Sequence, residues 1–152
     1  MSPEGSSITF RSVRGASLRR STERFAKTLE SRVAKGRPFA CLITTDSELR
    51  RLNRDFRGKD AATDVLSFPA SEAPGPAGGY LGDLAISLAR ARAQAAEFGH
   101  TLDCEIQILM LHGVLHLLGM DHERDRGRMA CAEKQWRARL GHPPGLIERV
   151  QA

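Results

Sequence analysis

Residues 106–122 carry the sequence IQILMLHGVLHLLGMDH, which constrains the fold more than any other part of the chain. Apolar side chains occupy most positions around His112 and His116, so the helix predicted here has no broad polar face for water. A helix that is apolar all round lies inside a fold, and we therefore expect this helix to be central. Buried imidazoles are unfavourable unless their ring nitrogens find partners, which makes these histidines the first candidates for function.

Three histidines in this stretch follow the pattern H-x-x-x-H-x-x-G-x-x-H. His112 and His116 are one helical turn apart and therefore project from the same face. Gly119 predicts the end of the helix, and His122 follows the turn. Three imidazoles that meet at one point suit zinc, and three protein ligands leave a fourth position open, as in catalytic zinc sites. We therefore predict one Zn²⁺ ion per chain, bound by His112, His116 and His122.

The pattern leaves alternatives at this site. Imidazole binds nickel, copper and iron as well as zinc. Asp121, Glu123 and Cys104 are candidates for a fourth ligand. Three separate histidines, each hydrogen-bonded in the core or at the surface, are the interpretation without a metal. The spacing and the helix-ending glycine favour the metal site.

The spacing matches the metzincin protease motif at every position but one. Gly113 stands where those proteases carry the glutamate that acts as general base, so the peptidase base is absent. An open zinc site lowers the pKa of a bound water to about 7 and polarises a phosphoryl oxygen, which makes hydrolysis the expected reaction class. Arg57 and Lys59, in a polar loop after a predicted helix, would supply the positive charge for phosphodiester cleavage, unless they only complement the helix end.

The order of predicted elements is β-α-β-α-β-β-α-α-α. This order favours an α+β fold, with a small mixed sheet of about four strands packed against helices. We expect a single metallohydrolase-like domain over residues 1–152, with a loose C-terminal tail from about residue 141 to residue 152. The predicted strands are residues 8–12, 39–43, 65–68 and 80–87, and the predicted helices are residues 18–34, 46–57, 88–98, 102–118 and 125–140.

Composition excludes several classes of protein. The chain has 152 residues, 41% of them hydrophobic, which suits one domain with its own core. No apolar run approaches the roughly 20 residues of a membrane span, and residues 1–20 lack the apolar segment of a secretory signal. Cys41, Cys104 and Cys131 are widely spaced, which indicates a reducing compartment without a disulfide framework. We therefore expect a cytoplasmic protein with no membrane partner.

Charge is unevenly distributed along the chain. Residues 1–60 hold 14 Lys and Arg against 7 Asp and Glu, residues 61–123 hold 2 against 8, and residues 124–152 hold 7 against 3. Basic segments attract polyanions such as nucleic acid, although two solvated basic faces would give the same counts. Aromatic residues are few, so binding of nucleic acid would depend on backbone charge more than on base stacking.

Four segments together resemble the bacterial YbeY family. They are RGKDAATDVLSFP at 57–69, LGDLAIS at 81–87, QAAEFGH at 94–100 and the histidine motif at 112–122. The resemblance implies a single-strand-specific, metal-dependent endoribonuclease that matures the 3′ end of 16S ribosomal RNA and acts in ribosome quality control. RNA, as the 16S rRNA precursor and the ribosome, is then the expected partner. Ribosomal proteins or a GTPase are further candidate partners.

The resemblance also assigns roles to residues. It makes His112, His116 and His122 the zinc ligands, and Arg57 the arginine that contacts RNA phosphate. Arg57 and His112 are thus the candidate catalytic residues, and Lys59 joins Arg57 as a candidate substrate-binding residue. The chain departs from the family pattern without losing a ligand, at Ala62 in place of Pro, Met120 in place of Tyr and Trp136-Arg137 in place of Ile-Leu.

Two other functions stay open from the sequence. A zinc peptidase would need Asp121 or Glu123 to replace the missing glutamate base. A non-catalytic ribosome assembly factor would use zinc only to hold the last two helices together. The peptidase predicts hydrolysis of casein, and the assembly factor predicts RNA binding without turnover.

Overall fold

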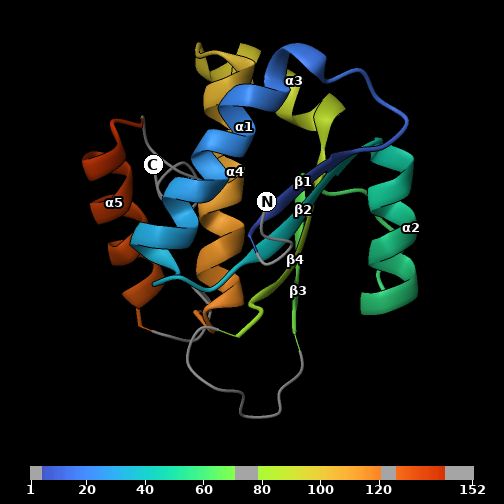
Figure 1. The fold of residues 1–152 in the computed structure, drawn as a ribbon. Coiled ribbons are helices and arrows are strands. Elements are labelled where there is room, and N and C mark those ends of the chain that lie inside the picture. Colours follow the sequence, from blue (N-terminus) through green and yellow to red (C-terminus); the bar gives the residue numbers. More distant parts are fainter. Residues whose placement is uncertain (1–4, 71–78, 121–125, 143–152) are drawn as a thin grey trace.

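A four-stranded mixed sheet organises the molecule (Figure 1). The computed structural model describes residues 5–70, 79–120 and 126–142. The strand order is β1-β2-β4-β3, in which β1, β2 and β4 are parallel and β3 pairs antiparallel with β4 at the edge. This confirms the predicted mixed sheet. The strands are β1 (Ser7–Phe10), β2 (Phe39–Thr44), β3 (Val65–Pro69) and β4 (Gly82–Ser87).

Helices cover both faces of the sheet, but unequally. α2 lies against one face, and α1, α4 and α5 lie on the other face (Figure 1). The order of elements is the predicted one, and it confirms the α+β class. The helices are α1 (Ala16–Thr28), which continues as the π-helical turn η1 (Leu29–Val33), α2 (Asp46–Arg57), α3 (Leu88–Phe98), α4 (Leu102–Leu117) and α5 (Arg128–Leu140).

Local side-chain chemistry fixes several element ends. Thr45 caps α2 by accepting a hydrogen bond from the backbone N–H of Glu48, and Thr101 caps α4 in the same way. β4 begins at Gly82, two residues later than predicted. At Gly82 φ is +144°, and a Cβ atom there would lie 2.5 Å from the carbonyl oxygen of Phe68, so only glycine lets the two strands approach this closely.

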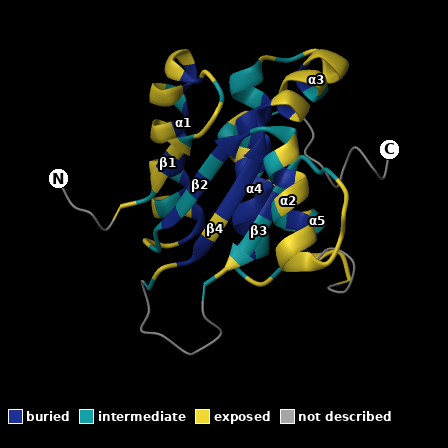
Figure 2. Ribbon diagram, turned by 90° about the vertical axis from the view of Figure 1, so that its right-hand side faces the viewer, coloured by how far each residue is buried: buried dark blue, intermediate teal, exposed yellow. Residues whose placement is uncertain are grey.

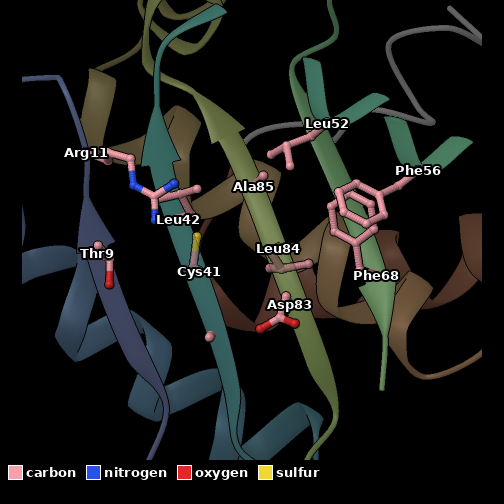
Figure 3. Close-up of a pocket in the computed structure, with 11 residues that line it drawn as sticks. Thr9, Arg11, Cys41, Leu42, Leu52, Phe56, Phe68, Asp83, Leu84 and Ala85 are labelled. Atoms are coloured by element: carbon pink, nitrogen blue, oxygen red, sulfur yellow. The ribbon is translucent and has the colours of Figure 1, made fainter. Parts of the chain in front are cut away.

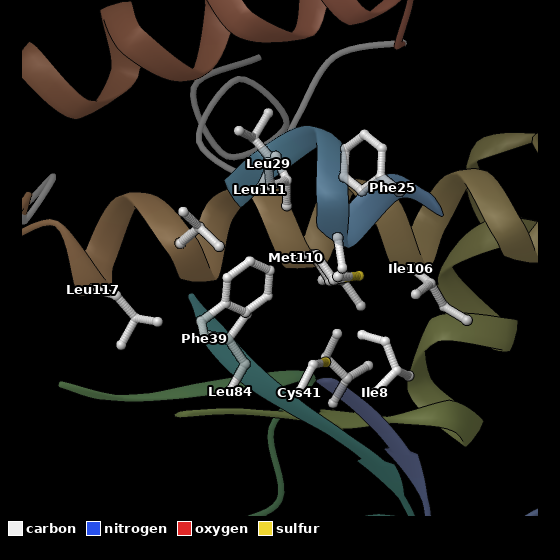
Figure 4. Packing of buried hydrophobic residues seen from close by; sticks show 14 of the residues in the cluster. Ile8, Phe25, Leu29, Phe39, Cys41, Leu84, Ile106, Met110, Leu111 and Leu117 are labelled. Carbon is white, nitrogen blue, oxygen red and sulfur yellow. The ribbon is translucent and has the colours of Figure 1, made fainter. Parts of the chain in front are cut away.

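The histidine-bearing helix α4 is the centre of the core. Eleven of its sixteen residues are buried, which confirms its predicted position (Figure 2). Its apolar side chains pack against α1 and against the inner face of the sheet, where Phe39, Cys41 and Leu84 meet Met110 (Figure 4). α4 thus carries both the core and the first two motif histidines.

Cys41, Cys104 and Cys131 all lie in the described parts of the chain, and none of them forms a disulfide there. Burial raises the pKa of the Cys41 thiol to about 12, so this thiol stays protonated at neutral pH. None of the helices in the described parts of the chain combines the length and the apolar character that crossing a bilayer requires.

His142, at the start of the predicted tail, packs onto the core. Its Nε2 atom lies 2.8 Å from Oε1 of Gln107, and its ring contacts that of Phe25, with centroids 5.1 Å apart. Residues 143–152 of the predicted tail lie outside the described residues. Burial, and then the electrostatic effect of His100, lower the pKa of His142 below the ordinary value of 6.5.

The lowered pKa of His142 makes stability depend on pH. Below about pH 6.5 the unfolded chain takes up a proton at this imidazole before the folded chain does, so acidification favours unfolding. The melting temperature should therefore fall more steeply between pH 7.5 and pH 5.5 in the wild type than in His142→Gln. Thermal unfolding followed by circular dichroism measures both slopes, and equal slopes would contradict the prediction.

Candidate metal centre

Two motif histidines face each other on α4. The Nε2 atoms of His112 and His116 are 3.2 Å apart, and the ring centroids are 4.8 Å apart. His112 is 7% exposed and His116 is half-buried, so the pair lies where the core reaches the surface. The helix places both rings on one face because the residues are four apart.

The donor pair fits a zinc ion. Two ligands on a tetrahedral zinc with bonds of about 2.0 to 2.1 Å are about 3.3 to 3.4 Å apart, close to the observed Nε2 separation of 3.2 Å. Gly119 adopts φ +94° directly after the last turn of α4, as the motif predicts. The structure thus brings two predicted ligands together, whereas His122, Asp121 and Glu123 lie outside the described residues.

Cys104 is not placed to be a fourth ligand. It lies in the first turn of α4, eight residues before His112, which is about 12 Å along the helix axis. Its backbone N–H instead donates to the capping hydroxyl of Thr101.

A buried glutamate lies behind His112. The Oε2 atom of Glu133, on α5, is 2.8 Å from Nδ1 of His112, and Glu133 is 1% exposed. Glu133 was not among the residues predicted from the sequence. The spacing of Met129 and Glu133 could have indicated a buried face on this mostly polar helix, because residues four apart lie on the same face. In the structure both face α4.

Gly113 lies where α4 packs closely against the sheet. A Cβ atom there would lie 2.6 Å from Cδ2 of Leu84 on β4. The Gly113 carbonyl also accepts a hydrogen bond of 3.2 Å from the hydroxyl of Ser67 on β3. The position that holds the glutamate base in metzincins therefore faces the sheet, so the difference from the protease motif has a packing cause.

Arg57 and Lys59 lie across the sheet from the histidines. Both are exposed at the C-terminal end of α2, on either side of Gly58, and α2 and α4 cover opposite faces (Figure 1). The structure therefore does not bring these residues into contact with the histidine pair. The sequence order alone contained no information on which face α2 would cover.

The edge strand β3 connects the two groups. Phe56, next to Arg57, contacts Phe68 of β3 edge to face, with centroids 5.8 Å apart. Ser67, the residue before Phe68 on β3, donates a hydrogen bond to the carbonyl of Gly113, which is the neighbour of His112. The basic end of α2 and the histidine pair thus flank the same edge strand.

Most other arginines of α2 are neutralised by carboxylates. Arg50 makes a two-pronged pair with Asp60, at 2.7 and 3.2 Å, and the hydrogen bond from Arg50 lowers the pKa of that carboxyl. Arg51 pairs with Glu48 at 2.6 Å. Arg57 and Lys59 make no ion pair within the described parts of the chain, which leaves their charges available to a ligand.

A pocket of about 420 Å³ lies on the α2 side of the sheet (Figure 3). Arg11, Phe56, Phe68 and Asp83 stand around it, over a floor of small and aliphatic strand residues. Of the candidate ligands that the structure describes, neither His112, His116 nor Cys104 lines it. This pocket is therefore separate from the candidate metal centre.

Comparison with known proteins points to one family. The family model described as Endoribonuclease YbeY matches residues 8–141. A protein named Endoribonuclease YbeY from Solibacter usitatus is 69% identical over 99% of both chains, and one from Koribacter versatilis is 56% identical over 72% of this chain and 68% of its own length. The solution structure of TM1509 from Thermotoga maritima is similar with a TM-score of 0.57 and 28% identity, covering 86% of this chain and 85% of the other.

Proposed function

Because the chain belongs to the YbeY family of endoribonucleases, we propose that it cleaves single-stranded RNA at a zinc centre formed by His112, His116 and His122. The observation that carries the proposal is the pair of Nε2 atoms of His112 and His116, 3.2 Å apart in the apolar part of α4. A metal ion bound by both nitrogens would give each of them a partner. In apolar surroundings, a polar atom without a partner is unfavourable. His122 is proposed as the third ligand on the motif spacing.

The residues of the centre have separate tasks in this proposal. A bound zinc ion would supply Lewis acidity toward the phosphodiester group. His112, which is buried, and His116, which is half-buried, would hold the ion. Arg57 would bind an RNA phosphate on the other side of β3, and Lys59 would help to bind the backbone.

The position of β3 supports a preference for single strands. β3 is the edge strand, with the histidine pair on one side and the basic end of α2 on the other. An RNA strand that crosses this edge would meet both groups. A single strand bends easily over such an edge, whereas a duplex resists bending on this scale.

We further propose that the substrate is the 3′ end of precursor 16S rRNA and that the enzyme acts in ribosome quality control in the cytoplasm. Family membership and the basic residues 1–60 support this assignment. Ribosomal proteins or a GTPase would then be its partners.

Replacing Arg57 by alanine should lower the rate of single-stranded RNA cleavage by about 10- to 100-fold, because a charge-assisted hydrogen bond to an RNA phosphate contributes about 1.5 to 3 kcal/mol. Single-turnover cleavage of a fluorescent oligoribonucleotide measures the rate. The same sequence in a duplex should be cleaved much more slowly by the wild type.

Arg54→Ala is the matched control for Arg57→Ala. Arg54 lies on the same helix, but its guanidinium pairs with Asp55 at 3.1 Å, so this variant should keep the wild-type rate. Equal rates for Arg57→Ala and the wild type would overturn the role of Arg57. Absence of any cleavage by the zinc-loaded wild type would overturn the proposed function.

A further inference from the structure

The two ring nitrogens of His112 face different partners. Nδ1 lies 2.8 Å from a carboxylate oxygen of Glu133, and Nε2 lies 3.2 Å from Nε2 of His116. A carboxylate only accepts hydrogen bonds, so Nδ1 must carry the hydrogen. A neutral imidazole has a single N–H, and Nε2 therefore keeps its lone pair on the side of His116.

We propose that Glu133 is a positioning residue, whose carboxylate holds His112 in the Nδ1–H tautomer and directs its Nε2 lone pair into the metal centre. The inference rests on the proposed zinc centre. The opposite tautomer would place a hydrogen on Nε2, where a metal ion needs a lone pair. Carboxylates that bind the second nitrogen of a histidine ligand commonly fix its tautomer and orientation in this way.

Glu133 is placed for this task and not for reaction with substrate. Its carboxylate bonds to the nitrogen of His112 that points away from His116, and its side chain is 2% exposed. A base that takes a proton from substrate or water must come within hydrogen-bond reach of it. Glu133 therefore does not act in place of the general-base glutamate that metzincins carry at the position of Gly113.

The helix α4 carries a second pair of the same chemistry. Near its first turn, Oε1 of Glu105 lies 2.6 Å from Nε2 of His100, and the Glu105 side chain is fully buried. His100 is not part of the histidine motif. The two pairs offer a comparison within one chain, because both hold a buried carboxylate and only one of them adjoins the proposed metal centre.

Glu133→Gln tests the inference with little change in volume. Its amide can donate to Nδ1 or accept from it, so the preference for one tautomer should disappear. Zinc affinity, titrated with zinc sulfate against a chromophoric chelator, should fall by about 10- to 100-fold. In the metal-free protein, long-range ¹H–¹⁵N spectra should show the Nδ1–H tautomer of His112 in the wild type and a mixture in the variant.

Glu105→Gln is the matched control. It makes the same chemical change at the other buried pair and should leave zinc affinity within about twofold of the wild type, although it should lower the melting temperature of the metal-free protein at least as much as Glu133→Gln does. Equal losses of zinc affinity in the two variants would show a merely structural role and overturn the inference.

The remaining outcomes also separate the two proposals. An unchanged zinc affinity and tautomer in Glu133→Gln, with a wild type that binds zinc and cleaves RNA, would overturn the role of Glu133 and leave the proposed function intact. A wild type that binds no zinc would overturn both.

Discussion

His116→Ala should lower the rate of RNA cleavage by about a thousandfold or more. Loss of Lewis acid assistance removes several kcal/mol of transition-state stabilisation, and about 4 kcal/mol corresponds to a factor of a thousand. His116 is the better test residue of the facing pair, because it is half-buried, whereas truncation of His112 would leave the buried Glu133 without its imidazole partner.

The measurement combines single-turnover cleavage with elemental analysis of the purified protein. The variant should contain substoichiometric zinc, and a chelator should reduce the wild type to the same low rate. Added zinc should restore the chelated wild type and not the variant. His142→Gln serves as the control, because it removes a histidine outside the motif and should keep both zinc and activity at pH 7.5. Full activity in His116→Ala would contradict the zinc-centred mechanism.

Gly113→Glu, which rebuilds the protease motif, should strongly destabilise the protein and should not produce a peptidase. The new side chain would start 2.6 Å from Cδ2 of Leu84 and would bury a carboxylate between α4 and the sheet. A buried charge without a partner, added to overpacking, is expected to destabilise by about 3 to 5 kcal/mol. This is a large part of the roughly 5 to 15 kcal/mol that stabilises a typical domain.

Urea denaturation measures this loss, and casein hydrolysis tests for a new activity. Gly113→Ala should lose less stability, because the gain in helix propensity of about 1 kcal/mol offsets part of the clash. Combining it with Leu84→Ala should show favourable coupling, since the shorter side chain makes room for the new methyl group. A stable Gly113→Glu protein that digests casein would contradict this account.

The sequence predicted those features that depend on local chemistry. The apolar run around His112 placed α4 at the centre, and the threonine caps at Thr45 and Thr101 located two helix starts. The pairing of β3 with β4 at the edge was not predictable, because the register of Val65 with Ile86 depends on contacts between distant segments.

The candidate site was only partly predictable for the same reason. Spacing along one helix determines how His112 and His116 face each other, so the motif was sufficient for that pair. Glu133 reaches His112 from another helix, 21 residues later, and Arg57 lies across the sheet. Residue spacing within a single helix or strand predicts neither the contact between Glu133 and His112 nor the position of Arg57.

The burial of most of α4 has a consequence for how this enzyme can be altered. The helix that bears the histidines also fills the core. A substitution on α4 that changes the proposed metal centre should therefore disturb folding as well. α5 is different, because Met129 and Glu133 are its only buried residues among those described, and much of its remaining surface is open to solvent. Natural divergence and engineering should therefore change the metal preference of the proposed centre more readily through α5, where the chain can vary without rebuilding its interior.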